Sequence, residues 1–518
     1  MSDRGTRSIG VRARELLAPD APALDLAVLR VIVAVVLWLD ASIEVAPAWA
    51  ALPEAARTIP TGVGWLVPHL PIDPPTIELV RVLFRVCCAA GAVGLFTRAS
   101  WVGVVLTASL LLLVPQLGGA VFHDHHLLWL AVIVAASPAG DALSIDAWWA
   151  RRTGSPRPTH GRAHGLGVRL AWLVIGLVFF FPGVHKLAEA GWGWALSDNL
   201  RNQMWWKWTQ DPSLIPSYRL DRHPVLVRGL AALTILFELA FLPAILLART
   251  RPWAVLAACA FHAGAQAFMG IEFSVLWASY PMFVPWSAVW ARLRPANRTR
   301  TLPTGTLPTD TLPTDTLPTG TLPTGTLPTG TLPTGTLPTG TLPTGTLQTG
   351  TLPTGTLPAG AWEPALVRLI VVATPLFLGI VTAGALGEMQ GYPFACYPTF
   401  QWPAADRMPA LELVATHRDG HATILDRSLF QEPGPRGWAL SWRLAGVYGP
   451  FDPEALRAWW VDRAAQSALS SRLDDVDRID ASRVEIDVDP DGVHEVRSRV
   501  PLATLQHEGT RWQLVADP

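Results

Sequence analysis

Nine apolar segments constrain the fold of this chain more than any other feature. Most of them reach the roughly 20 residues that an α-helix needs to cross the hydrocarbon core of a bilayer. Half of the 518 residues are hydrophobic and only 16% are charged, whereas soluble domains carry about 25% charged residues. We therefore predict a mainly α, polytopic transmembrane helix bundle. The predicted spans lie near residues 24–46, 76–97, 100–118, 126–138, 166–187, 226–248, 253–270, 272–291 and 364–386.

Two of these segments fit a membrane span less well than the others. The segment 126–138 is short. The segment 272–291 contains Pro281 and Pro285, which interrupt helical hydrogen bonding, so it either crosses the bilayer or re-enters on one side.

Arginines predict the orientation of the bundle, because short cytoplasmic loops collect Lys and Arg. The basic N-terminus, residues 1–23, is therefore placed in the cytoplasm. Alternation of the spans then brings all the remaining Arg-rich connections to the cytoplasmic side. Their arginines are Arg98, Arg151, Arg152, Arg157, Arg162, Arg249, Arg251, Arg292, Arg294, Arg298 and Arg300. This agreement predicts about eight spans within 24–291 and a last one at 364–386. Loops 47–75 and 188–225 would lie outside the cytoplasm, with the C-terminal region.

A low-complexity linker occupies residues 292–361, and residues 301–360 within it are twelve TLPTG-type pentads. A five-residue period fits neither helix nor strand, and proline in nearly every unit prevents regular backbone hydrogen bonding. We predict a disordered, semi-extended linker. An insertion without function, produced by replication slippage, is favoured over a specific binding array.

The polar region 387–518 predicts a small α+β extracytoplasmic domain. Apolar and polar residues alternate on both sides of Asp491-Gly492, which is typical of a β-hairpin. The segment 451–469 reads as a helix, with Asp452 as its N-cap and Pro453 in its first turn.

Other functions are excluded by charge and motif. The net charge of −1 provides no electrostatic footprint for nucleic acid. The chain also has neither a phosphate-binding loop nor a dinucleotide-binding fingerprint, and its four cysteines form no CxxC pair.

The stretch FFFPGVHKLAEAGW, Phe179–Trp192, places Lys186 at the end of a long apolar run. One interpretation is structural: a Lys at a helix end reaches the membrane interface with its ammonium group. The other is chemical. Partial burial disfavours the charged amine, so a desolvated Lys can act as a base.

Histidines form two further candidate sites. FHDHHLLWL holds His123, Asp124, His125 and His126, but this spacing matches no common metal motif, so we predict no metal site. Hydrogen bonding to a substrate, or plain interface polarity, explains the cluster better. His262, in AFHAGAQAF, either packs within the bundle or lines a cavity.

Charged residues inside the predicted spans should pair within the bundle, because an isolated charge at membrane depth is costly. Their partners are not evident from the sequence. These residues are Arg30, Asp40, Glu44, Arg81, Arg85 and Glu238.

Five segments together resemble one membrane family. They are LRVIVAVVLWLDA, GLFTR, DHHLLWLAVIVAASPAGDALSIDAW, FFFPGVHKLAEAGWGW and FHAGAQAFMGIEFSVLWASYPMFVPW. In order and spacing they resemble the HTTM family, the membrane domain shared with vitamin K-dependent gamma-carboxylases. The resemblance covers roughly residues 24–291.

The resemblance implies a carboxylase-type reaction chamber near the extracytoplasmic face. A Lys would deprotonate reduced vitamin K or another quinol, oxygen would convert the product into a strong base, and that base would take a γ-proton from a Glu before CO₂ is captured. Lys186 matches the position of the catalytic Lys, and His125 and His262 match two supporting histidines. The implied partners are the lipid bilayer and a protein or peptide Glu substrate. His185 departs from animal carboxylases, which have a second Lys at that position.

Two classes of function therefore follow from the sequence. The first is a membrane carboxylase/epoxidase with Lys186 as base. The second is a non-catalytic membrane protein that binds lipid or quinone, or serves as an anchor or in export, and presents its C-terminal domain.

Overall fold

The chain divides into two units, one formed by Met1–Val289 with Trp362–Pro518 and the other by Trp290–Ala361. The predicted TLPTG linker, the basic residues before Glu15 and His123 fall outside the described residues. The computed structural model describes residues 15–119, 124–293, 363–388, 391–395, 400, 402–425, 440, 443–444, 446, 452–464, 473–492, 496–508 and 511–515.

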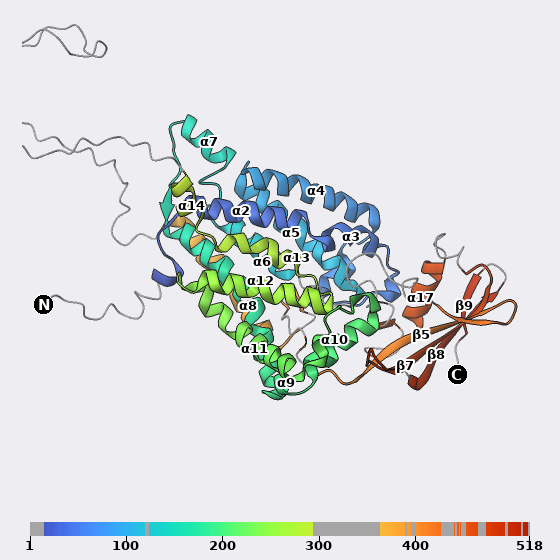
Figure 1. The fold of residues 1–518 in the computed structure, drawn as a ribbon. Helices are drawn as coiled ribbons and strands as arrows, with labels where there is room; N and C mark the ends of the chain where they lie inside the picture. The colour runs from blue at the N-terminus through green and yellow to red at the C-terminus, as the bar shows by residue number, and fades with distance from the viewer. Residues whose placement is uncertain are drawn as a thin grey trace, which may run out of the picture. The chain divides into compact units, whose positions relative to one another are not determined.

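A bundle of long helices forms most of the first unit, and these helices run alongside one another in Figure 1. Every predicted apolar segment contains helix, which confirms the mainly α membrane fold. The bundle helices are α2 (Ala23–Trp38), α3 (Ala41–Ala50), α4 (Pro74–Val93), α5 (Thr97–Leu113), α6 (His125–Ala136), α8 (Arg162–Ala190), α11 (Pro224–Leu246), α12 (Arg251–Met269) and α15 (Pro364–Leu386).

Five helical segments among the described residues are long and apolar enough to cross a membrane, fewer than the nine predicted spans. The helix α4 is not among them because it carries three charged residues, Glu78, Arg81 and Arg85, and α6 is apolar but short. The five segments are Ala23–Ala50, Thr97–Gly118, Arg162–Ala190, Pro224–Leu246 and Pro364–Leu386.

Two predicted spans are broken rather than continuous. The first is interrupted between α2 and α3, where the Asp40 side chain accepts a hydrogen bond from the Ile43 backbone N–H at 3.0 Å and caps α3. The segment 272–291 consists of α13 (Ser274–Ser279), η6 (Tyr280–Phe283) and α14 (Trp286–Leu293). Its two prolines lack the backbone N–H that a continuous helix requires.

Arg30, on α2, is fully buried and connects neighbouring segments at one end of the bundle through hydrogen bonds. Its guanidinium donates to the carbonyls of Ala139 and Leu143 at 2.5 Å and to those of Ala92 and Ala142 at 3.2 Å. These carbonyls belong to the end of α4 and to the connection after α6. The predicted intramembrane charge is therefore hydrogen-bonded to backbone carbonyls.

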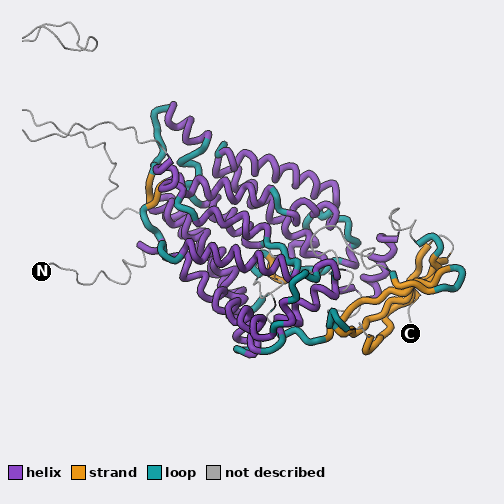
Figure 2. The backbone as a smooth tube through the Cα atoms, in the orientation of Figure 1, coloured by secondary structure: helices purple, strands orange, loops and turns teal. Residues whose placement is uncertain are grey.

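The C-terminal region contains a five-stranded antiparallel sheet and a helix, drawn in orange and purple in Figure 2. The strand order is β6-β5-β7-β8-β9. The predicted hairpin is confirmed, because β7 and β8 pair antiparallel on either side of Asp491-Gly492. The Asp452 side chain also caps α17, accepting from the Ala455 N–H at 3.0 Å. The elements are β5 (Arg407–His417), β6 (Ala422–Ile424), α17 (Pro453–Ala464), β7 (Val476–Asp487), β8 (Val496–Glu508) and β9 (Arg511–Val515).

Short contacts join this region to the loop between α3 and α4. The strand β2 (Thr61–Gly62) pairs parallel with β4 (Gly391–Tyr392). Gly62 has φ +79°, and a Cβ there would lie 2.4 Å from the Tyr392 carbonyl oxygen, so glycine is required. Arg443 adds hydrogen bonds to the carbonyls of Ala56 and Gly118. The loop and the C-terminal region thus meet, and their side of the membrane stays a prediction.

Replacing Arg30 with Leu should destabilise the bundle strongly. A buried carbonyl left without a donor costs about 1–3 kcal/mol. Four carbonyls lose their donor here, that of Ala139 in a buried hydrogen bond and the other three in part-buried ones. We expect a drop in the melting temperature in detergent of at least about 5 °C. Arg228→Leu is the control, since Arg228 pairs with Asp198 at the surface, where a pair contributes only about 0–1 kcal/mol. Equal melting temperatures for the two variants would contradict this role of Arg30.

Candidate functional site

A cavity of about 950 Å³ lies among α8, α10 (Asn199–Gln210), α11 and α12. Its volume falls in the range of about 300–1,000 Å³ that is typical of small-molecule sites. The break between α2 and α3 and the beginning of α13 complete its wall. Several of its lining residues are phenylalanines: Phe179, Phe237, Phe261, Phe268 and Phe273.

Lys186 and Glu238 form a buried ion pair in the cavity wall. The Lys186 Nζ, on α8, lies 2.6 Å from Oε1 and 2.9 Å from Oε2 of Glu238, on α11. The two side chains are 3% and 6% exposed. The indole of Trp194 lies 5.2 Å from the same Nζ, within cation–π range. Lys186 therefore does not reach outward as an interfacial Lys would.

A close approach of two helices makes this pair possible. Gly183 lies on α8 just before the Lys186 turn, and a Cβ at that position would be 3.0 Å from the Glu238 Cβ and 3.2 Å from Leu239. A larger residue would push α11 away. The glycine in the FFFPG stretch thus allows α8 and α11 to approach until the ammonium and the carboxylate meet.

His262 contributes a second polar group to the same cavity. It is 1% exposed, and its Nε2 is hydrogen-bonded to the Tyr280 hydroxyl at 2.6 Å. The ring also packs against Phe273, with 4.4 Å between centroids. The sequence left open whether His262 packs within the bundle or lines a cavity. In the structure it does both.

His125 does not line the cavity. It is buried at the beginning of α6, with its ring edge-on to Tyr392 at 5.1 Å between centroids. The next residue, His126, lines the cavity instead, together with Asp124. The Ser42 hydroxyl donates to Asp124 at 2.5 Å. The structure therefore brings Lys186 and His262 to one cavity and leaves His125 behind its wall.

His185 points elsewhere, although it is adjacent to Lys186. Its Nε2 is hydrogen-bonded to the Gly384 carbonyl on α15 at 2.7 Å, and it does not line the cavity. As for metals, no group of three or more His, Cys, Asp or Glu among the described residues has an arrangement that would hold an ion.

A cover over one side of the cavity was not indicated by the sequence. It consists of α9 (Gly193–Leu196) and α10, within the predicted 188–225 loop. The Trp194 Nε1 donates to the Phe400 carbonyl at 2.7 Å, and Asn202 donates to the Ala404 carbonyl at 2.9 Å. Trp194 and Phe400 also line the cavity. The many tryptophans of this loop were the available signal, because indole N–H groups usually bind a partner when buried.

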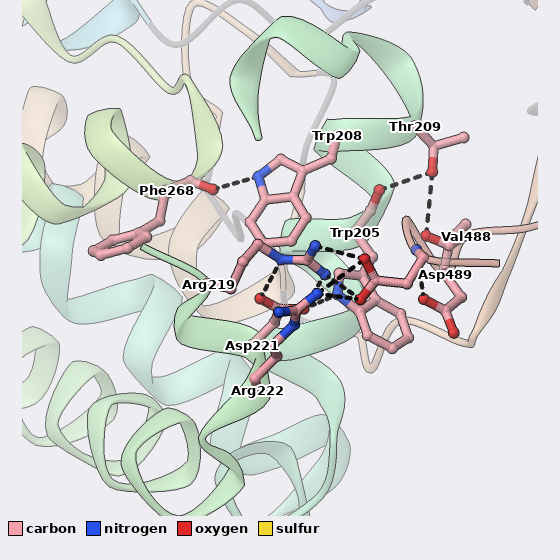
Figure 3. A network of polar contacts seen from close by, with 10 residues as sticks. Trp205, Trp208, Thr209, Arg219, Asp221, Arg222, Phe268, Val488 and Asp489 are labelled. Atoms are coloured by element: carbon pink, nitrogen blue, oxygen red, sulfur yellow. Dashed lines mark hydrogen bonds and ion pairs between the residues drawn. The ribbon is translucent and has the colours of Figure 1, made fainter. Parts of the chain in front are cut away.

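An arginine cluster at η5 (Leu220–Arg222), in the connection that follows α10, joins the cover to the C-terminal region (Figure 3). Arg219 donates to Asp221 at 2.7 Å and to Asp491 at 2.8 Å, and Arg222 also reaches Asp491. Hydrogen bonds from Arg219 and then Arg222 hold the pKa of Asp491 below its ordinary value. Trp205 donates to the same Asp221 carboxylate at 3.0 Å.

The comparison with protein families covers the part of the chain that contains the cavity. A family model described as the HTTM domain matches residues 19–287, slightly more than half of the sequence. The chain belongs to the HTTM family. The resemblance predicted from the five sequence motifs is thereby confirmed. Comparisons with curated proteins and with solved structures gave no significant match.

The HTTM domain contains the Lys186–Glu238 ion pair. It also contains His262 and both helices of the cover. Phe400, which closes one edge of the cavity, lies outside the matched range, as do β5 to β9. The cavity is therefore mainly a property of the HTTM domain, with one wall residue added by the C-terminal region.

Replacing Lys186 alone should destabilise the HTTM domain, because it leaves Glu238 buried without its counter-charge. Breaking such a pair on one side costs about 3–5 kcal/mol, whereas replacing both partners costs far less. We expect Lys186→Met to lower the melting temperature in detergent and Lys186→Met with Glu238→Gln to restore most of it. Additive losses in the double variant would show that the two side chains do not interact.

Acid should loosen the contact at Asp491. Its folded pKa is lowered by Arg219 and Arg222, so the contact is complete above the unfolded value of about 3.9 and is lost as pH falls through the lowered pKa. Hydrogen exchange over 488–492, corrected for intrinsic rates, should lose protection in that range. Asp491→Asn should show reduced protection already at pH 7, unlike Asp475→Asn, which affects the pairing with His417 within the same region. Unchanged protection in Asp491→Asn would refute the contact.

Proposed function

We propose that this HTTM protein is a membrane enzyme of the vitamin K-dependent gamma-carboxylase type. The overall reaction would convert a quinol, O₂, CO₂ and a Glu side chain into the quinone epoxide, water and γ-carboxyglutamate. The single observation that carries the proposal is the Lys186–Glu238 pair in the wall of a largely apolar cavity. A buried charged pair at membrane depth is costly and is usually retained for a task.

The cavity lining suits a quinol. Aromatic side chains such as Phe179 and Phe261 offer flat apolar surfaces for a ring. Lys186 and His262 add polar groups that can bind hydroxyls at the ring edge. When bound, the quinol would supply, with molecular oxygen, the strong base that takes the γ-proton.

The ion pair changes how Lys186 would act. The chemical interpretation of the sequence assumes a desolvated neutral amine, but an ammonium held by a carboxylate has no free lone pair. We propose that the pair accepts a proton as a unit: Lys186 Nζ passes a proton to Glu238 and takes one from the substrate hydroxyl. The 2.6 Å separation supports such a transfer. His262, bonded to Tyr280, would orient the ring from the other side.

The side of the membrane belongs to the proposal as well. We place the cavity near the extracytoplasmic face, with the C-terminal region outside. The Arg-rich connections predict the opposite end of the bundle as cytoplasmic. His125, behind the cavity wall, would act at most by positioning His126 or Tyr392.

Quinol epoxidation by the purified protein tests this proposal. Wild type in nanodiscs, given reduced vitamin K and a Glu-containing peptide, should form epoxide, and Lys186→Ala should lose at least about 10²-fold in rate, as expected when a general base is removed. Lys207→Ala is the matched control, since Lys207 also lines the cavity but lies on α10. Equal inactivity of wild type and Lys186→Ala with several quinols would refute the enzyme and favour a non-catalytic binder.

A further inference from the structure

We infer that the cavity opens sideways into the bilayer between α11 and α12, and that this opening holds the hydrocarbon tail of an amphiphile whose polar head lies at Lys186. The location of the opening is independent of the proposed function. Only the identity of the head, a quinol, rests on it.

The α11 side of the opening is exposed and apolar. Leu230 and Leu233 both line the cavity, yet they are 36% and 59% exposed. Pro224–Leu246 is one of the helices long and apolar enough to cross a membrane. Its exposed leucines would therefore contact lipid on one side and the cavity on the other.

The α12 side of the opening consists of small residues. Ala257, Ala260 and Gly264 are spaced three and four residues apart, so they lie on one face of the helix, and all three line the cavity. Ala257 and Ala260 are exposed. A Cβ added at Gly264 would meet no atom within 4 Å, so open space adjoins this face.

The chemistry changes along the cavity from this edge inward. The leucines and alanines at the edge are exposed, whereas Lys186, Glu238 and His262, which line the same cavity, are buried. A ligand that satisfies both ends has a hydrogen-bonding head and an apolar tail. The edge at the α2–α3 break is more polar, with Asp40 and Ser42 in its wall and Asp124 hydrogen-bonded to Ser42. It suits a tail poorly, because carboxylates are costly beside hydrocarbon.

Binding of oxidised quinones, which needs no turnover, tests the opening. The probes are a quinone with a long isoprenoid tail and its tail-less analogue, each titrated into protein in nanodiscs. Gly264→Phe and Ala260→Phe should lower the affinity for the long-tailed quinone by about tenfold or more, since each buried CH₂ of the tail contributes about 0.8 kcal/mol to binding. The tail-less quinone should bind these variants as it binds wild type.

Two controls make the result specific. Ala263→Phe adds the same bulk to an exposed site on α12 that does not line the cavity, and should change neither affinity. Ala41→Phe narrows the edge at the α2–α3 break, where Ala41 is exposed and lines the cavity. The inference would be overturned if Ala41→Phe lowered the affinity for the long-tailed quinone and Ala260→Phe did not. Equal losses of affinity for the two quinones, or no binding of the long-tailed quinone to wild type, would overturn it as well. Tail-dependent binding without epoxidation would support the opening and refute only the enzyme.

Discussion

The buried ion pair between Lys186 and Glu238 is the interaction on which the architecture of the cavity depends. Neither charge is stable alone at membrane depth, so α8 and α11 must lie close enough for the two groups to meet. Gly183 permits that approach, since any Cβ there would press on α11. The cavity then forms on the side where the two helices are covered by α12 and α10.

Irregular helices supply the rest of the site. The break between α2 and α3 brings Asp40 and Ser42 to the cavity wall, where an unbroken span would present only helix side chains. The broken segment after α12 places Tyr280 beside His262. Backbone irregularity at membrane depth is tolerated where it is buried in protein or lines a cavity. In this HTTM domain such breaks border the same space as the ion pair.

The apolar periodicity and the turn signals were sufficient to predict the helices, the hairpin at Asp491-Gly492 and the Asp452 cap. Local patterns determine these features. Pairing between distant segments was not predictable, because any of several intramembrane carboxylates could have met Lys186. Glu238 meets Lys186 because α8 packs on α11. The two residues are 52 positions apart in the sequence, so no local pattern reveals the pair. His125 and His126 show the same limit: both are buried at the start of α6, and packing alone decides which one reaches the cavity.

The most direct test of the account is to find where a quinone ring binds in the folded protein. A quinone with a photoreactive group on its ring, activated in nanodiscs and followed by peptide mapping, should label residues near Lys186 and His262 on α8 and α12. Excess unlabelled quinone should remove that labelling. Labelling confined to α15 or to the C-terminal sheet, with none on α8 or α12, would contradict the claim that the ion-paired cavity is the site of function.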